Sequence, residues 1–300
     1  MGLMAKFLQP VAMAYSHHKK PAANRVDHTM SLLIIDALNI IRRIHEAIAE
    51  PDSQEKVADT INSSLRSFRR ALNTHKPTHA VAVFDHGGST WKHDLYEGYQ
   101  AHRQPMPQAL RDGLLTLQHE LHGLGLHWIA IEGIEADDAI AALVDKWCKY
   151  SAEQAVILST DKDFLQLLSD QVCIYDHFKD VWRDATYVQE KFGVKPGQMG
   201  DLLALMGDAV DGIPGVDKVG RKTAATLLRI NGNLDRLISN ADKVAGQVGV
   251  NLRKGIEIAR LSRQLVSFKT DVPLGLTWRM LAQPGVQTPP SHCVSRSIGD

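Results

Sequence analysis

The sequence predicts an α/β domain built on a mostly parallel sheet, followed by a smaller helical module. Short apolar runs alternate with segments of helical periodicity across the first two-thirds of the chain, which is typical of a parallel sheet covered by helices. After Pro196 no strand-like run follows, and short helical segments broken by glycine extend to about residue 265. We therefore expect the α/β domain over residues 30–195 and the helical module over residues 196–280.

Five apolar runs predict the strands of the sheet: residues 31–36, 79–84, 127–131, 155–159 and 172–176. A helix is predicted from Glu135 to Trp147, where apolar residues recur at offsets of three and four and form one face. Residues 1–29 lack such periodicity and are expected to be a flexible extension. Residues 281–300, with two prolines and many small polar residues, are expected to be a disordered tail.

Composition limits the class of protein. The 300 residues include 34 Lys+Arg and 34 Asp+Glu, so the formal net charge is zero and any basic nucleic-acid surface must be a local patch. The three scattered cysteines exclude a disulfide framework and a Cys-x-x-Cys zinc site, which favours a reducing cytoplasm. No apolar run approaches the roughly 20 residues that span a bilayer. We expect a cytoplasmic monomer with no membrane partner.

Acidic residues follow four successive predicted strands. The carboxyl ends of parallel strands lie along one edge of a sheet, so acids far apart in sequence converge there. Two acids of the helical module are expected to reach the same edge. The set comprises Asp36, Asp85, Glu135, Asp137, Asp138, Asp161 and Asp163, with Asp208 and Asp211 from the module.

Converging carboxylates need a counter-charge, because like charges a few ångströms apart cannot all stay ionised. Hard divalent cations supply it, and a ligand set made only of oxygens selects Mg²⁺ or Mn²⁺ over zinc. Two such ions about 4 Å apart are the recurring arrangement for phosphodiester cleavage. The alternative is structural: a single Asp after a strand usually caps a helix, and Asp137 and Asp138 also suit a helix dipole.

A glycine-rich hairpin between two helices is predicted from Gly207 to Ala224. Gly215 and Gly220 allow close approach of backbone to a phosphate, and the N–H groups that open the next helix face the anion. Basic residues lie beside it, which indicates a helix-hairpin-helix that grips the DNA backbone without reading sequence. The alternative is an ordinary glycine-capped turn. The expected contacts are Lys218, Val219, Gly220, Arg221, Lys222 and Thr223.

Several motifs together resemble one family. They are Ile35–Asn39, Val83–Asp85, Glu135–Asp138, Ser159–Leu167 and the hairpin, in that order. Over residues 30–270 the chain resembles the bacterial 5′-nucleases, which include the N-terminal nuclease of DNA polymerase I. The stretch Asn39–His45 is most similar to flap endonucleases of the exonuclease IX type. The resemblance implies a PIN-like nuclease domain with a helix-3-turn-helix module, and Mg²⁺-dependent cleavage of DNA with 5′ flaps or 5′ ends, with 5′-3′ exonuclease activity in addition.

The resemblance also implies roles for individual residues. Ligands of a first Mg²⁺ would be Asp36, Asp85, Glu135 and Asp137, with Asp36 and Asp137 central to catalysis. A second cluster would comprise Asp161, Asp163, Asp208 and Asp211, with Asp138 between the two. Arg103 would stabilise charge on the phosphate. Backbone carbonyls would hold K⁺ in the hairpin, those of Leu205, Met206, Pro214, Val216 and Val219. Tyr99, Arg42 and Arg43 are further expected DNA contacts.

One position departs from the family pattern. Relatives usually carry Tyr-Lys ahead of the arginine, whereas this chain has Tyr99-Gln100. The missing charge would be replaced by His102 or Lys92, or catalysis would be slower. A DNA-structure-binding protein without catalysis is therefore a second hypothesis. A phosphatase of the haloacid dehalogenase type is disfavoured, because that chemistry needs an acid where this chain has Leu38.

Overall fold

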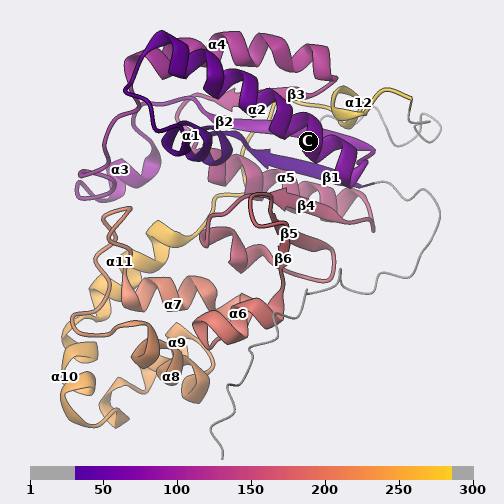
Figure 1. Ribbon diagram of the computed structural model, residues 1–300. Helices are drawn as coiled ribbons and strands as arrows, with labels where there is room; N and C mark the ends of the chain where they lie inside the picture. Colours follow the sequence, from indigo (N-terminus) through magenta and orange to yellow (C-terminus); the bar gives the residue numbers. More distant parts are fainter. Residues whose placement is uncertain (1–30, 286–300) are drawn as a thin grey trace, which may run out of the picture.

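The computed structural model describes residues 31–285, so the predicted extension at 1–29 lies outside the described residues. A single six-stranded sheet forms the centre, with helices on both of its faces and a group of helices packed below one face (Figure 1). The strands are β1 (Leu32–Asp36), β2 (His79–Asp85), β3 (His127–Ile131), β4 (Ala155–Leu158), β5 (Val172–Asp176) and β6 (Val181–Arg183). Their order in the sheet is β3-β2-β1-β4-β5-β6.

The five predicted strands are confirmed, and all of them pair in parallel. The sequence prediction missed β6, which pairs antiparallel with β5 at the edge of the sheet. Its three residues are too few to show a period of two, so it carries no local signal. Because β1 lies between β2 and β4, the carboxyl ends of the first, second and fourth predicted strands are neighbours, as the site hypothesis requires.

Helices cover both faces of the sheet, which explains why the strands are continuous apolar runs. Along β1, Leu33 and Ile35 face the core under the first group of helices, and Leu32 and Ile34 face the core of the opposite side. The first group is α1 (Ala37–Ala47), α2 (Gln54–His75) and α4 (Gln108–Leu121). The opposite face is covered by α5 (Ala136–Tyr150), which matches the predicted helix. The short α3 (Trp91–Leu95) lies beyond β2.

The helical module continues the core of the α5 face. Leu203, Leu205 and Val266 belong to the same apolar cluster as Leu32 and Ile34 of the sheet, so the module is packed directly against the α/β domain. Its helices are α6 (Ala185–Phe192), α7 (Met199–Met206), α8 (Arg221–Asn231), α9 (Leu234–Ser239), α10 (Gly246–Lys254) and α11 (Ile256–Val266). Single 3₁₀ turns cover His122–Leu124, Asp163–Leu167, Pro196–Gln198 and Ala241–Lys243.

The chain returns from the module to the sheet, which corrects the predicted tail for residues 281–285. Helix α12 (Trp278–Leu281) packs Trp278 edge-on against Trp147 of α5, with ring centroids 5.0 Å apart. Ala282 then bridges His79, and the Gln283 N–H donates to the carbonyl of Thr78 at 2.8 Å. These contacts join residues far apart in sequence, so local composition could not predict them. Residues 286–300 lie outside the described residues.

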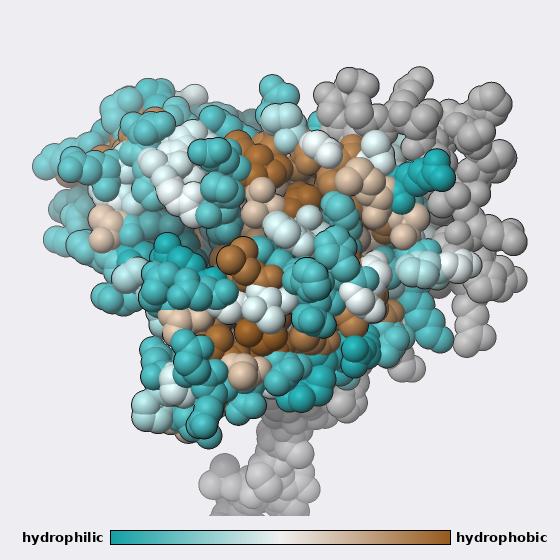
Figure 2. Space-filling view, turned by 90° about the horizontal axis from the view of Figure 1, so that it is seen from above, coloured by the Kyte–Doolittle hydropathy of each residue, from teal (hydrophilic) through white to brown (hydrophobic). Residues whose placement is uncertain are grey.

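On the face that α2 and α4 cover, hydrophilic side chains surround smaller apolar areas (Figure 2). Within residues 31–285, no helix combines the length and the apolar character needed to cross a bilayer.

Candidate metal centre and nucleic-acid interface

An open cavity of about 600 Å³ lies at the carboxyl edge of the sheet. Carboxylates from the ends of β1 and β2, the start of α5 and the loop after β4 all line it, together with arginines from α1, α4 and the loop before α4. The acids expected from the sequence are Asp36, Asp85, Glu135, Asp137, Asp161 and Asp211, and Glu46 of α1 also lines the cavity; the arginines are Arg42, Arg43, Arg103 and Arg111. Six of the nine acids expected at this edge therefore share one cavity.

Asp36 is fixed by donors from two directions. The Asn39 N–H donates to its Oδ1 at 3.3 Å, so Asp36 caps α1, and the Ser159 hydroxyl donates to its Oδ2 at 2.7 Å. The same hydroxyl oxygen accepts the Asp161 N–H at 3.0 Å, which ties the loop after β4 to the end of β1. Burial raises the pKa of Asp36 to about 7, with Asp161 and Asp85 adding to the effect against the Ser159 hydrogen bond. No local feature of the sequence predicts this role for Ser159.

Asp85 is the last residue of β2, and Asp137 lies in the first turn of α5. Oδ1 of Asp85 accepts the Ala136 N–H at 2.8 Å, which pins the first turn of α5 to the end of β2. Burial, followed by the charges of Asp161 and Asp36, raises the pKa of Asp137 well above its ordinary value. Such crowding of buried carboxylates is the electrostatic signature of a cation site.

Glu135 lines the same cavity but is already held by three donors. Its Oε1 accepts the Thr90 hydroxyl at 3.1 Å, and its Oε2 accepts the Tyr99 hydroxyl at 3.2 Å and lies 2.9 Å from Nζ of Lys92. The site hypothesis is corrected here twice. Tyr99 is only 4% exposed, so its ring cannot stack on a base, and the buried Lys92 ammonium is committed to Glu135 and cannot replace a lysine at position 100.

Asp138 does not join either cluster, contrary to the sequence prediction. Its Oδ2 accepts the Trp91 indole N–H at 2.6 Å, and its Oδ1 accepts the Lys269 N–H at 2.8 Å. The side chain is fully buried. Asp138 therefore ties α3 and the returning C-terminal segment to α5, one helix position away from the cavity-facing Asp137.

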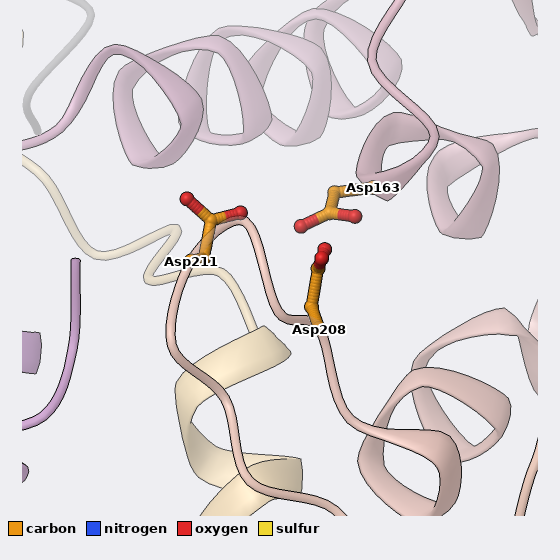
Figure 3. Close-up of side chains that lie close together, drawn as sticks. All are labelled: Asp163, Asp208 and Asp211. Carbon is orange, nitrogen blue, oxygen red and sulfur yellow. The ribbon is translucent and has the colours of Figure 1, made fainter. Parts of the chain in front are cut away.

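A second cluster forms where the helical module meets the sheet edge. Carboxylate oxygens of Asp163, Asp208 and Asp211 lie within 4.8 Å of one another, and the carboxylates of Asp163 and Asp208 face each other across a gap (Figure 3). Oδ1 of Asp163 is buried and accepts no hydrogen bond, although Nζ of Lys162 lies 3.6 Å from it. Burial raises the pKa of Asp163 to about 7, and Asp161, Asp211 and Asp208 add to it while Lys162 opposes them. A carboxylate oxygen without a hydrogen bond, among other carboxylates, fits a divalent cation.

Gln100 connects the loop between α3 and α4 to this second cluster. Its side-chain amide donates to Oδ1 of Asp211 at 3.2 Å, and its N–H donates to the Asp211 carbonyl at 2.9 Å. Three residues on, Arg103 is exposed at the cavity rim, and no ion pair engages it among residues 31–285. Exposed His102 does not line the cavity.

The two arginines of α1 reach the cavity differently. Arg43 donates to the Thr160 hydroxyl at 3.2 Å and stacks on Phe178, 4.9 Å from the ring centroid. Arg42 has a buried Nε without a partner, and burial followed by the charge of Arg103 lowers the pKa of its guanidinium. The cavity therefore offers positive groups beside its acids.

The hairpin after α7 is built from close backbone contacts. The Val216 N–H donates to the Leu205 carbonyl at 2.8 Å, and the Val219 N–H donates to the Val216 carbonyl at 3.0 Å. Gly215 has a φ of +65°, and a Cβ there would lie 2.3 Å from the backbone N of Gly207. Only glycine allows this turn.

Three cations surround the start of α8. Lys218, Arg221 and Lys222 are exposed, and no ion pair engages them within the described part of the chain. Gly220 is the N-cap residue of α8 and Thr223 is half-buried. Val219 is buried, so its side chain cannot contact DNA and only its backbone remains a candidate.

Two family models together span the described chain. The 5′-3′ exonuclease N-terminal resolvase-like domain matches residues 31–193, and the C-terminal SAM fold of the 5′-3′ exonuclease matches residues 194–288. The chain belongs to the 5′-3′ exonuclease family. The predicted resemblance is thereby confirmed, as is the division into an α/β fold and a helical module.

Similar relatives are named flap endonuclease Xni. The protein from Psychromonas ingrahamii is 34% identical over 253 residues, which cover 84% of this chain and 96% of the relative. A protein from Shewanella baltica is 37% identical over 259 residues, covering 85% and 97%. The match therefore extends over most of the α/β domain and of the helical module.

Solved structures share the fold at lower identity. The phage T5 D15 protein crystallised with metal ions has a TM-score of 0.68 at 22% identity, covering 80% of this chain and 90% of its own. The catalytic core of Rad2 in complex with a DNA substrate has a TM-score of 0.51 at 20% identity, covering 77% and 73%. At these identities the similarity establishes the family's fold.

Proposed function

We propose that this member of the 5′-3′ exonuclease family is a structure-specific 5′ nuclease that hydrolyses DNA phosphodiesters at 5′ flaps and 5′ ends. The observation that supports it most is the convergence of six carboxylates and Arg103 in one open cavity. Relatives named flap endonucleases match more than 80% of the chain.

Two groups of carboxylates are suited to divalent cations, for which Mg²⁺ is the expected ion. Asp36, Asp85 and Asp137 would hold one, together with Asp161, which the resemblance assigned to the second group. Asp163, Asp208 and Asp211 would hold another. Glu135, the remaining ligand that the resemblance implies, lines the cavity of the first group. The fit rests on the donor set, which is all oxygen, and on Oδ1 of Asp163, which accepts no hydrogen bond. When bound, such ions activate water and neutralise charge on the scissile phosphate.

The protein's own groups position the substrate. Arg103 and Arg42 lie on the cavity wall without ion-pair partners among residues 31–285, so they are available for charge-assisted hydrogen bonds to a phosphate. Ser159 and Asn39 hold the carboxylate of Asp36 in one orientation. Preorganised groups of this kind stabilise developing charge without reorganising during the reaction.

The hairpin is proposed to bind the DNA backbone away from the cut. Lys218, Arg221 and Lys222 surround the N-terminus of α8, where free N–H groups favour a phosphate. The carbonyls proposed for K⁺ are those of Leu205, Met206, Pro214, Val216 and Val219. Those of Leu205 and Val216 each accept one backbone hydrogen bond, which leaves a lone pair on each oxygen.

Mapping the products from DNA labelled at a 5′ flap, with Mg²⁺ and with EDTA, tests the proposal. We expect cleavage near the base of the flap only with Mg²⁺, and much slower cleavage of duplex without a free 5′ end. Tight flap binding without cleavage at any Mg²⁺ concentration would instead favour the binding-only hypothesis, which the glutamine at position 100 motivates.

A further inference from the structure

Lys162 extends its side chain into the second carboxylate cluster. Its Nζ forms an ion pair with Oδ2 of Asp208 and lies 3.6 Å from Oδ1 of Asp163. The lysine side chain is 32% exposed, whereas those of Asp208 and Asp163 are 7% and 12% exposed. The ammonium therefore reaches from the protein surface into the space between two largely buried acids.

The electrostatics of the cluster explain this position. Three carboxylates within 4.8 Å repel one another, and no other Lys or Arg nitrogen of the described chain lies within 4.0 Å of them. Burial alone would lower the pKa of Lys162, but Asp163 and Asp208 outweigh it and hold the pKa above its ordinary value. The Lys162 ammonium, paired with Asp208 and close to Asp163, therefore supplies positive charge to the cluster.

The first cluster lacks such a group. In the part of the chain that the structure describes, no Lys or Arg nitrogen is within ion-pair distance of Asp36, Asp85, Asp137 or Asp161. The arginines on the cavity wall form no ion pair with those four side chains, so a cation in direct contact with them would have to be a bound ion. The two clusters thus differ in whether a lysine ammonium lies within ion-pair distance of the carboxylates, and such a charge affects the affinity for a metal ion.

We propose that Lys162 is a resident counter-ion that competes with a divalent cation for the second cluster and makes this the weaker of two metal sites. The proposal rests on the metal centre proposed above. A cation that binds Asp208 and Asp163 must displace the ammonium from the same oxygens. Because the lysine side chain is a third exposed, the displaced ammonium can move toward solvent.

The test is calorimetric titration of the full chain with Mn²⁺, without DNA, comparing the wild type with Lys162→Met. Methionine keeps an unbranched chain of similar length without the charge. We expect the second Mn²⁺ to bind about tenfold more tightly in the variant, which corresponds to about 1.4 kcal/mol, while the first site changes little. Lys162→Arg retains the charge and should keep the second site weak. Lys149→Met, which breaks a surface ion pair with Asp145, is the matched control and should change neither site.

The melting temperature provides a second measurement, which also detects a variant that fails to fold. Without metal, Lys162→Met should melt at a lower temperature than the wild type, because three carboxylates lose their counter-charge, and Mn²⁺ should restore more of its stability. Should the methionine variant fail to fold, Lys162→Gln gives the same comparison. Equal or weaker binding of the second Mn²⁺ in a folded, uncharged variant would overturn the proposal. Failure of the wild type to bind any Mn²⁺ would refute the metal centre as well, whereas Mn²⁺ binding without DNA cleavage would refute only the nuclease.

Discussion

The two carboxylate clusters lie side by side at one edge of the sheet, yet different parts of the fold position them. The first is built on the ends of parallel strands, and hydrogen bonds from Ser159, Asn39 and Ala136 fix its acids. The second brings Asp163 together with Asp208 and Asp211 of the helical module, so it forms only when the module is packed on the sheet. Within the described residues, no Lys or Arg nitrogen lies within ion-pair distance of Asp36, Asp85, Asp137 or Asp161, whereas the second cluster contains Lys162.

We expect acids of similar sequence context to differ in metal affinity through one neighbouring charge, that of Lys162. Substitutions in the first cluster should therefore reduce catalysis more than substitutions in the second.

The largest effect is expected for Asp137→Asn, which removes a charged ligand from the first cluster and keeps the shape. Cleavage of a flap substrate should fall by on the order of a thousandfold or more, because water activation and charge stabilisation both depend on the cation. DNA binding should survive or tighten, and the metal-free melting temperature should not fall, because burial and like charges already disfavour the ionised carboxyl.

Two variants on the same helix control this prediction. Asp145→Asn, which alters a surface ion pair, should leave cleavage unchanged. Asp138→Asn should lower the melting temperature more than Asp137→Asn does, because it perturbs the hydrogen bonds to Trp91 and Lys269. If Asp137→Asn cleaves at nearly the wild-type rate, Asp137 serves only to start the helix and is not a metal ligand.

A smaller effect is expected for Asp163→Asn in the second cluster. Cleavage should fall about ten- to a hundredfold, because the weaker site contributes charge stabilisation but not the first cation. Mn²⁺ titration should show the first binding event intact and the second lost. Loss of both binding events would mean that the clusters form one site, which would contradict the distinction between a stronger and a weaker metal site.

Substitutions in the hairpin should separate DNA binding from catalysis. Changing both Arg221 and Lys222 to Ala should reduce the slope of log binding constant against log salt by about two, roughly one unit for each phosphate contact. Turnover at saturating substrate should change little. Arg229→Ala combined with Lys254→Ala removes the same charge from exposed positions elsewhere in the module and should leave the slope unchanged. If the double variant at Arg221 and Lys222 has the same salt slope as the control double variant at Arg229 and Lys254, the hairpin does not touch phosphate.

The smallest effect concerns pH and stability without metal. Burial foremost raises the pKa of Asp36 and Asp163 to about 7 in the folded chain, from an ordinary value near 4. Both carboxyls bind a proton more tightly when folded, so their contribution to stability is present below about pH 4 and is lost as the pH rises through 7. In EDTA, melting between pH 5 and 8 should show a decline on the order of 5 °C.

Mg²⁺ should offset this decline, since it binds the ionised carboxylates and its stabilising effect grows with pH. Asp163→Asn should flatten the profile in EDTA. A melting temperature in EDTA that rises from pH 5 to pH 8 and is unaffected by Asp163→Asn would contradict the shared burial of the two carboxyls.

Three features could be predicted from the sequence alone. They are the five parallel strands, the helix of residues 135–147 and the edge of the sheet at which the acids meet. These follow from local hydrophobic runs and from a topological rule, that parallel strands end on the same side, and both are readable without knowing any contact. The glycine hairpin was predictable for the same reason, because Gly215 needs a backbone conformation that few other residues adopt.

Which acids face the cavity, and which groups surround them, depends on how the elements pack together. Asp137 and Asp138 are adjacent in sequence, but α5 turns one toward the cavity and the other toward Trp91 and Lys269. The burial of Tyr99, the role of Ser159 and the ion pair of Lys162 depend on partners 36 to 123 residues away. Long-range contacts leave no trace in local composition or periodicity, so they become visible only once the sheet, the loop between α3 and α4, and the helical module are packed together.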